Sequence, residues 1–143
     1  MKKLMKATMP VLFLMSIIFS ACEKPEVQKP QPAAPVPVSF TIKYKWIPKD
    51  AAEKEKSGTG DIAAGETGVL YLLEPNLKGD GICCDGKWTH TIDTKENNYS
   101  VTQHIKTGVV SFRPNNFGTY KITIVYTCPG GTKYAQTITV TIP

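Results

Sequence analysis

The sequence lacks the short motifs that mark common catalytic sites. It contains no Gly-x-Ser-x-Gly, no His-Glu-x-x-His and no phosphate-binding loop. The chain has only two histidines, His90 and His104, and neither stands at a metal-ligand spacing from a cysteine. The sequence therefore predicts a protein that is not an enzyme and that binds no metal ion and no cofactor.

A cluster of basic residues is also missing, although the whole chain carries a net charge of +5. Lys2, Lys3 and Lys6 supply more than half of that excess and stand at the very start of the chain. Without residues 1–21, 14 Lys and Arg face 12 Asp and Glu, and the net charge falls to +2. Nucleic-acid binding needs Lys and Arg gathered on one face, so we expect no nucleic-acid partner.

The N-terminal apolar run is too short to cross a membrane as a helix. It extends from Met9 to Phe19, whereas a helical span needs about 20 apolar residues. Lysines precede the run and small residues follow it, which is typical of a secretory signal peptide. Removal of residues 1–21 leaves 122 of the 143 residues, enough for one domain of ordinary size.

The stretch Phe19-Ser20-Ala21-Cys22 resembles the lipobox of bacterial lipoproteins. The resemblance implies cleavage before Cys22, a diacylglycerol on its sulfur and an acyl chain such as palmitate on its amino group. Several acyl chains, at about 0.8 kcal/mol per buried methylene, anchor a protein stably in a membrane. Because Glu23 rather than Asp follows, the resemblance implies the outer membrane, on either its periplasmic or its surface face. The alternative is an ordinary signal peptide with Cys22 in a disulfide.

A proline-rich segment follows the predicted lipid anchor. Residues 22–37 contain Pro25, Pro30, Pro32, Pro35 and Pro37 and nothing that could build a core. Such chains favour the extended polyproline II conformation, at about 3.1 Å per residue, and would hold a domain roughly 50 Å or less from the lipid. We expect a passive tether, with a docking motif for another protein as the alternative.

From Val38 onward, apolar and polar residues alternate with a period of two, which is typical of half-buried strands. Seven such segments are bounded by Gly, Pro, Asn and Asp. They lie at residues 38–47, 67–74, 87–92, 99–105, 108–114, 118–128 and 132–142. Many short strands with turn residues between them predict an all-β sandwich or barrel. Residues 48–66 are charged and rich in Ala and Gly, and are expected to form a solvated excursion, or one or two helical turns after Pro48.

Three of these stretches, "AGETGVLYL", "FGTYKITIVYTC" and the final "TITVTI", resemble an immunoglobulin-like domain of the polycystic-kidney-disease (PKD) type. Gly118-Thr119-Tyr120 matches the Gly-x-Tyr that opens the penultimate strand of that family. The family signature Trp-x-Phe-Gly-Asp-Gly is absent, and "CCDGKWTH" stands in its place. The resemblance implies a seven-stranded antiparallel β-sandwich over residues 38–143.

The cysteines beyond the signal are Cys83, Cys84 and Cys128. An exported protein meets an oxidising compartment, which favours a disulfide. In an immunoglobulin-like sandwich the loop before the third strand and the end of the sixth strand lie at one pole. We favour a disulfide between Cys84 and Cys128. Cys84 and Trp88 are an even number of positions apart in the sequence, so the alternation of a strand would place both side chains on the same face. This bond would contribute roughly 4 kcal/mol. The alternatives are Cys83 with Cys128 and a bond between Cys83 and Cys84.

The same pole is expected to carry charged and amide side chains on its loops. The candidate binding residues are Asn76, Lys78, Asp80, Asp85 and Lys133. Calcium binding is the minor alternative, because Lys78 stands where an oxygen ligand is needed. Loops on a rigid scaffold are common binding sites. The sequence thus predicts a non-catalytic binding or scaffolding module with a protein or glycan partner. The alternative is a structural subunit of an envelope-spanning assembly, such as a type VI secretion system.

Overall fold

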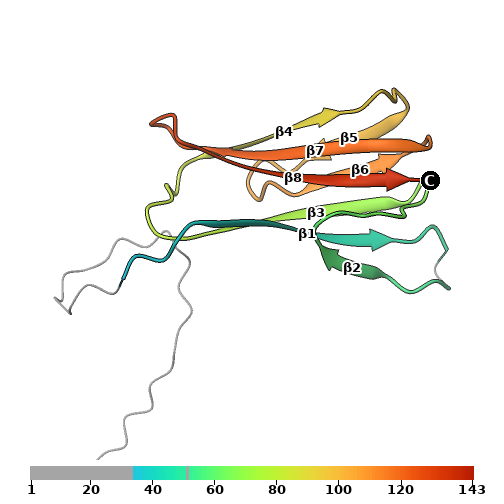
Figure 1. Ribbon diagram of the computed structural model, residues 1–143, viewed down its shortest axis with the longest axis horizontal. Coiled ribbons are helices and arrows are strands. Elements are labelled where there is room, and N and C mark those ends of the chain that lie inside the picture. The colour runs from blue at the N-terminus through green and yellow to red at the C-terminus, as the bar shows by residue number, and fades with distance from the viewer. Residues whose placement is uncertain (1–33, 51) are drawn as a thin grey trace, which may run out of the picture.

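The computed structural model describes residues 34–50 and 52–143. Within these residues the chain forms eight β-strands and no helix. The predicted signal peptide, the lipidation site Cys22 and most of the tether lie outside the described residues. The strands run along the long axis of the domain, so that its loops gather at the two ends (Figure 1). The expectation of an all-β fold is confirmed.

The strands form two antiparallel sheets. The five-stranded sheet has the order β2-β1-β3-β6-β5, and the three-stranded sheet has the order β4-β7-β8. The strand bounds in the first sheet are Ser39–Ile47 for β1, Lys56–Thr59 for β2, Leu70–Lys78 for β3, Tyr99–Gln103 for β5 and Val110–Pro114 for β6. Those in the second sheet are Lys87–Asp93 for β4, Gly118–Thr127 for β7 and Lys133–Ile142 for β8. Each of the seven predicted segments therefore overlaps one strand, although β3 extends four residues beyond its predicted end.

The core lies between the two sheets, as in a β-sandwich. Along β7 the side chains of Tyr120, Ile122 and Ile124 are buried, while the residues between them face outward. They pack in one cluster with Tyr71 of β3 and Phe112 of β6, which come from the opposite sheet. Burying each large apolar side chain stabilises the fold by about 1.5–3 kcal/mol. The alternation of apolar and polar residues in the sequence therefore matches the alternation of buried and outward-facing side chains in the strand.

The eighth strand, β2, lies in the charged segment that was expected to be solvated or helical. Its residues KSGT carry no apolar alternation, and β2 forms by pairing antiparallel with β1. The Lys56 ammonium lies 4.1 Å from the centre of the Trp46 ring and forms a cation–π contact with it. The prediction of seven strands is thus one short, because a partner strand rather than hydrophobicity organises this segment. The alternative of helical turns is wrong for the described residues 48–50 and 52–66.

A short stretch beyond β2 covers the outer edge of β8 near its end, at Thr139 and Thr141. Ile62 donates its backbone N–H to the carbonyl of Thr139 and accepts one from Thr141, both at 2.8 Å. The Ile62 side chain is buried in the core. The Asp61 carboxylate accepts a further hydrogen bond from the backbone N–H of Thr139, at 2.7 Å. Covering an edge in this way removes backbone groups that could otherwise pair with another chain.

Candidate functional site

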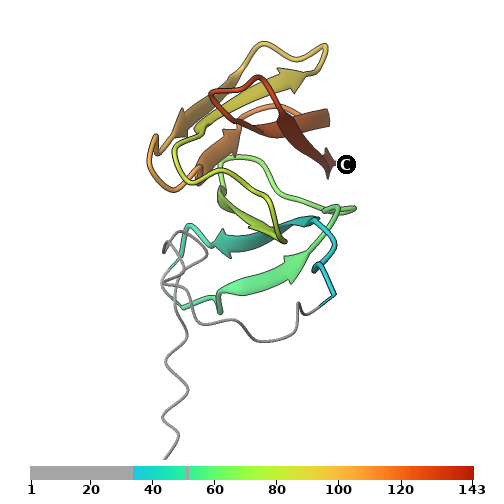
Figure 2. The same cartoon turned by 90° about the vertical axis from the view of Figure 1, so that its left-hand side faces the viewer.

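One end of the domain holds the cysteines, and we call it the cysteine pole. It consists of residues 79–86 between β3 and β4, residues 128–132 between β7 and β8, and residues 36–38 ahead of β1. These loops lie together at the left end of the domain in Figure 1, and Figure 2 looks onto that end. A disulfide joins Cys83 to Cys128, with 5.8 Å between the two Cα atoms. The favoured pairing of Cys84 with Cys128 is wrong, and the alternative through Cys83 is correct.

The loop geometry explains why Cys83 is the partner. The favoured pairing assumed that the alternation of β4 extends back to Cys84. Instead β4 begins at Lys87, and the chain bends at Cys84 and Asp85. The Tyr126 hydroxyl donates to the carbonyl of Cys83 at 2.9 Å and accepts from the N–H of Gly86 at 3.0 Å. One tyrosine of β7 thus fixes both ends of the bend and holds Cys83 beside Cys128.

Cys128 belongs to a tight turn between β7 and β8. The N–H of Gly131 donates to the carbonyl of Cys128 at 2.9 Å, and the N–H of Cys128 donates to the carbonyl of Thr132 at 2.8 Å. Gly131 has a φ of 89°, which a residue with a side chain rarely adopts. Only 8% of Cys128 is exposed. The turn therefore presents Pro129 and Gly130 to solvent while its first residue stays anchored.

The chain segment ahead of β1 is bound into the same pole. Val36 donates its backbone N–H to the Asp80 carboxylate at 2.7 Å, and its carbonyl accepts the N–H of Asp80 at 3.0 Å. A Cβ on Gly79 would collide with the backbone of Val38, so the two segments are in close contact. The last residues of the predicted tether thus dock against the loop that carries Cys83.

The predicted binding residues do not all lie in loops. Asn76 and Lys78 belong to β3, and the Asn76 amide donates to the Thr41 hydroxyl at 3.4 Å. Asp80 is engaged by Val36, and Lys133 opens β8. Placing Asn76 and Lys78 in the loop was wrong, because β3 continues through Pro75 to Lys78 on its pairing with β1. Lys78, Asp85 and Lys133 are nevertheless exposed around the cysteine pole.

The two histidines have ordinary roles within the sheets and turns. His90 of β4 and Gln103 of β5 share a hydrogen bond of 3.0 Å that links the edges of the two sheets. His104 contacts the Thr107 hydroxyl in the turn after β5, at 3.0 Å. Among the described residues no group of three or more His, Cys, Asp or Glu side chains could hold a metal ion.

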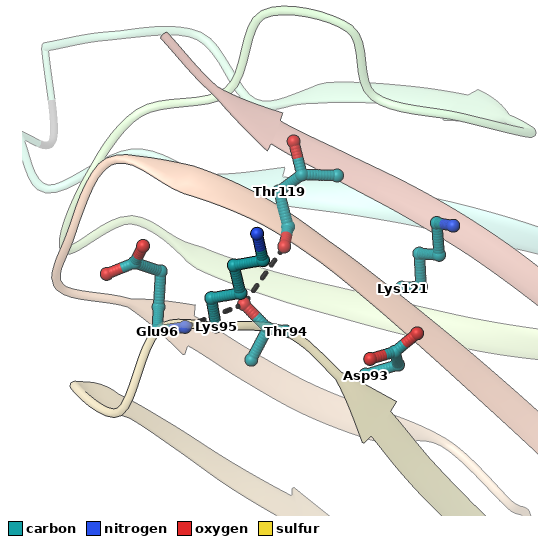
Figure 3. A pocket seen from close by; sticks show the side chains of 6 residues that line it. All are labelled: Asp93, Thr94, Lys95, Glu96, Thr119 and Lys121. Atoms are coloured by element: carbon teal, nitrogen blue, oxygen red, sulfur yellow. Dashed lines mark hydrogen bonds between the residues drawn. The ribbon is translucent and has the colours of Figure 1, made fainter.

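A shallow pocket of about 330 Å³ lies at the opposite end of the domain. Its lining residues come from the end of β4, the loop after it and the start of β7; they are Asp93, Thr94, Lys95, Glu96, Thr119 and Lys121 (Figure 3). The Thr94 hydroxyl donates to the carbonyl of Thr119 at 2.9 Å and accepts the N–H of Glu96 at 3.1 Å. This threonine ties the loop to the first residues of β7.

Burial raises the pKa of two tyrosines, Tyr71 and Tyr120. Both side chains are in the core, and each hydroxyl remains near its surface with a backbone partner. The Tyr120 hydroxyl donates to the carbonyl of Asn116, four residues upstream, at 2.9 Å. The Tyr71 hydroxyl accepts the N–H of Glu66 at 2.7 Å. The raised pKa moves both phenols further from ionisation at physiological pH.

Comparisons with known proteins return no match to a family model, a curated protein or a solved structure. Within residues 34–50 and 52–143 no helix is long and apolar enough to cross a membrane.

Proposed function

We propose that this protein is a lipid-anchored binding or scaffolding module of the bacterial cell envelope. The proposed anchor is the acylated Cys22 in the outer membrane, and the proposed activity is non-catalytic binding of a partner. The observation that carries the proposal is the construction of the cysteine pole. Its loops are held by the disulfide between Cys83 and Cys128 and by the hydroxyl of Tyr126. Rigid loops of this kind lose little entropy when a partner binds.

An immunoglobulin-like identity of the sandwich, in its PKD-type form, is part of this proposal. The orders β1-β3-β6-β5 and β4-β7-β8 support it, because immunoglobulin constant-type domains arrange their first, second, fifth and fourth strands against the third, sixth and seventh. Tyr120, whose hydroxyl bonds back to Asn116, matches the tyrosine corner of that fold. Trp88 on β4 packs 4.7 Å from Tyr126, centre to centre. In this proposal β2 is an addition to the seven strands.

The charges around the pole indicate where a partner would make contact. Lys78, Asp85 and Lys133 are exposed and surround the loops that the disulfide joins. Charges of both signs at the rim of an interface contribute mainly to specificity and to the association rate. A partner with complementary charges would therefore recognise this end of the domain.

Affinity capture from solubilised envelopes tests the proposal. The full chain and two charge-reversal variants, Lys133→Glu and Lys54→Glu, are compared. Lys54 is also an exposed lysine, lies outside the cysteine pole and serves as the matched control. The expected result is a protein or glycan captured by the wild type and by Lys54→Glu but depleted with Lys133→Glu. Equal capture by all three would contradict a partner site at the cysteine pole. Capture of secretion-machine components would favour the structural-subunit alternative.

A further inference from the structure

The end opposite the cysteine pole exposes an aromatic ring. We call this end the distal pole and define it as the loop of residues 94–98 and the loop of residues 115–117. Phe117 in the second loop is 69% exposed. A phenylalanine has no polar group to satisfy, so leaving its ring in water gives up the stabilisation that burial would provide. An aromatic ring kept at the surface is therefore a candidate contact for a ligand.

Amide side chains beside Phe117 form a connected network. The Asn115 amide donates to Oδ1 of Asn98 at 3.3 Å, and the Asn98 amide donates to Oδ1 of Asn116 at 3.4 Å. The Asn116 amide in turn donates to Oε2 of Glu96 at 3.4 Å. Every one of these groups retains capacity for further bonds, since an amide has two N–H donors and a carboxylate oxygen has two lone pairs. Hydroxyl groups of a ligand could occupy the remaining positions.

The backbone holds this network in place before any ligand arrives. The N–H of Asn115 donates to the carbonyl of Asn98 at 3.0 Å, which joins the two loops. The Tyr120 hydroxyl, from a side chain buried in the core, fixes the carbonyl of Asn116. At Gly118 an added Cβ would lie 2.7 Å from Cγ of Glu96, so Glu96 packs directly on the start of β7. Because the two loops are already held in place, a ligand that binds them loses little free energy to loop ordering.

The pocket of Figure 3 adjoins the network through Glu96, which lines it and accepts the bond from Asn116. Two carboxylates, Asp93 and Glu96, and two ammonium groups, Lys95 and Lys121, surround the pocket. Their charges cancel, so the pocket offers no net attraction to an ion. It is open, and carboxylate, ammonium and hydroxyl groups line it. These properties suit a neutral ligand that carries many hydroxyl groups.

We propose that the distal pole binds an uncharged polysaccharide chain. The ring of Phe117 packs against the C–H face of one sugar unit, and the side chains of Asn98 and Glu96 bond the hydroxyls of its neighbour. A shallow, open pocket admits the middle of a long chain, whereas an enclosed cavity would admit only its end. The site lies far from the cysteine pole, where Val36 docks, and it does not depend on the lipid anchor.

Isothermal titration calorimetry tests this proposal with the full chain purified from membranes. The detergent is a polyoxyethylene type, because a maltoside headgroup would compete as a sugar. The ligands are cellohexaose, chitohexaose and maltohexaose, with an alginate hexasaccharide as the anionic comparison. We expect at least one neutral chain to bind with a Kd of about 1 mM or tighter. Phe117→Ala is expected to weaken that binding about tenfold or more, and Asn98→Ala to weaken it as well.

Ile105→Ala is the matched control, since Ile105 is an apolar residue that is 81% exposed and lies outside the distal pole. It should leave the affinity unchanged, and all variants should melt at the wild-type temperature because the altered side chains are exposed. Absence of binding to all three neutral chains overturns the proposal. So does unchanged affinity in Phe117→Ala, or tighter binding of alginate than of any neutral chain. None of these failures bears on the anchoring at Cys22 or on a partner at the cysteine pole.

Discussion

Tyr126 stabilises the cysteine pole through two hydrogen bonds made by one hydroxyl group. It donates to Cys83 and accepts from Gly86, while its ring packs on Trp88. A Cβ on Gly86 would collide with that ring, so the chain can pass over the tyrosine only at a glycine. The position of the disulfide thus depends on a residue some 43 positions away from Cys83 in the sequence.

Tyr126→Phe should destabilise the fold by about 1–3 kcal/mol, because the ring remains but two partly buried backbone groups lose their partner. Urea unfolding followed by tryptophan fluorescence measures the change in the free energy of unfolding. Tyr134→Phe is the control, since Tyr134 is a half-exposed tyrosine on the neighbouring strand β8. Equal midpoints for the two variants would mean that the Tyr126 hydroxyl does not support the loop.

Cys128→Ser should lower the free energy of unfolding by about 2–5 kcal/mol, since the disulfide no longer restricts the unfolded chain. Cys83→Ser should cost a similar amount, and the double variant should cost little more than either one. The comparison is made by urea unfolding under non-reducing conditions. Additive losses in the double variant would show that Cys83 and Cys128 act independently and are not bonded to each other.

At this scale the sequence predicted the presence of the disulfide but not its correct partner. Cys83 and Cys84 are adjacent, and the choice between them depends on the direction in which each side chain points. Alternation gives that direction only inside a strand, and β4 begins at Lys87, after both cysteines. The bend before it is set by Tyr126, a long-range contact that no local pattern contains.

Among the elements, the short stretch around Ile62 joins the sandwich at the edge of β8. Ile62 bridges to Val140 in parallel and places its side chain, 4% exposed, in the core. Ile62→Ala should therefore cost about 2–5 kcal/mol. Ile105→Ala should change the stability by less than about 0.5 kcal/mol, because that side chain is 81% exposed. Thermal and urea unfolding of the two variants check this difference.

If Ile62→Ala lowers the free energy of unfolding by no more than Ile105→Ala does, the stretch around Ile62 is not part of the folded core. If the loss is as large as expected, hydrogen exchange should also become faster at the N–H of Thr141, which Ile62 accepts. That second measurement separates uncovering of the β8 edge from a general loosening of the core.

The strands that the sequence predicted are those in which every second side chain is buried or half-buried. Seven strands follow from the period of two because their buried side chains repeat at every second residue. The strand β2 has no such face and exists only because β1 offers it backbone partners. The end of β3 was missed for a related reason, since Pro75 and Asn76 are typical of turns although pairing with β1 extends the strand through them.

For the whole molecule, the two ends of the sandwich have different contacts with the rest of the chain. The cysteine pole binds the segment ahead of β1 through Val36 and Asp80. The distal pole carries the pocket, the amide network and Phe117. If Cys22 is lipidated, the tether holds the domain by the cysteine pole, and the distal pole faces away from the point of attachment. The site predicted from sequence covers only the first of these ends, because cysteines mark that end in the sequence, whereas the asparagines of the second are ordinary turn residues.

The proposed lipid attachment at Cys22 has one direct test. Mass spectrometry of the N-terminal peptide, from protein purified out of bacterial membranes, reports the first residue and its modification together. We expect a chain that begins at Cys22 and carries the added mass of a diacylglycerol and one further acyl chain. Cys22→Ser, as the matched variant, should remain unprocessed or leave the membrane fraction. A soluble protein that begins at another residue, or a chain that begins at Cys22 without lipid, would show that the protein is not a lipoprotein anchored at Cys22.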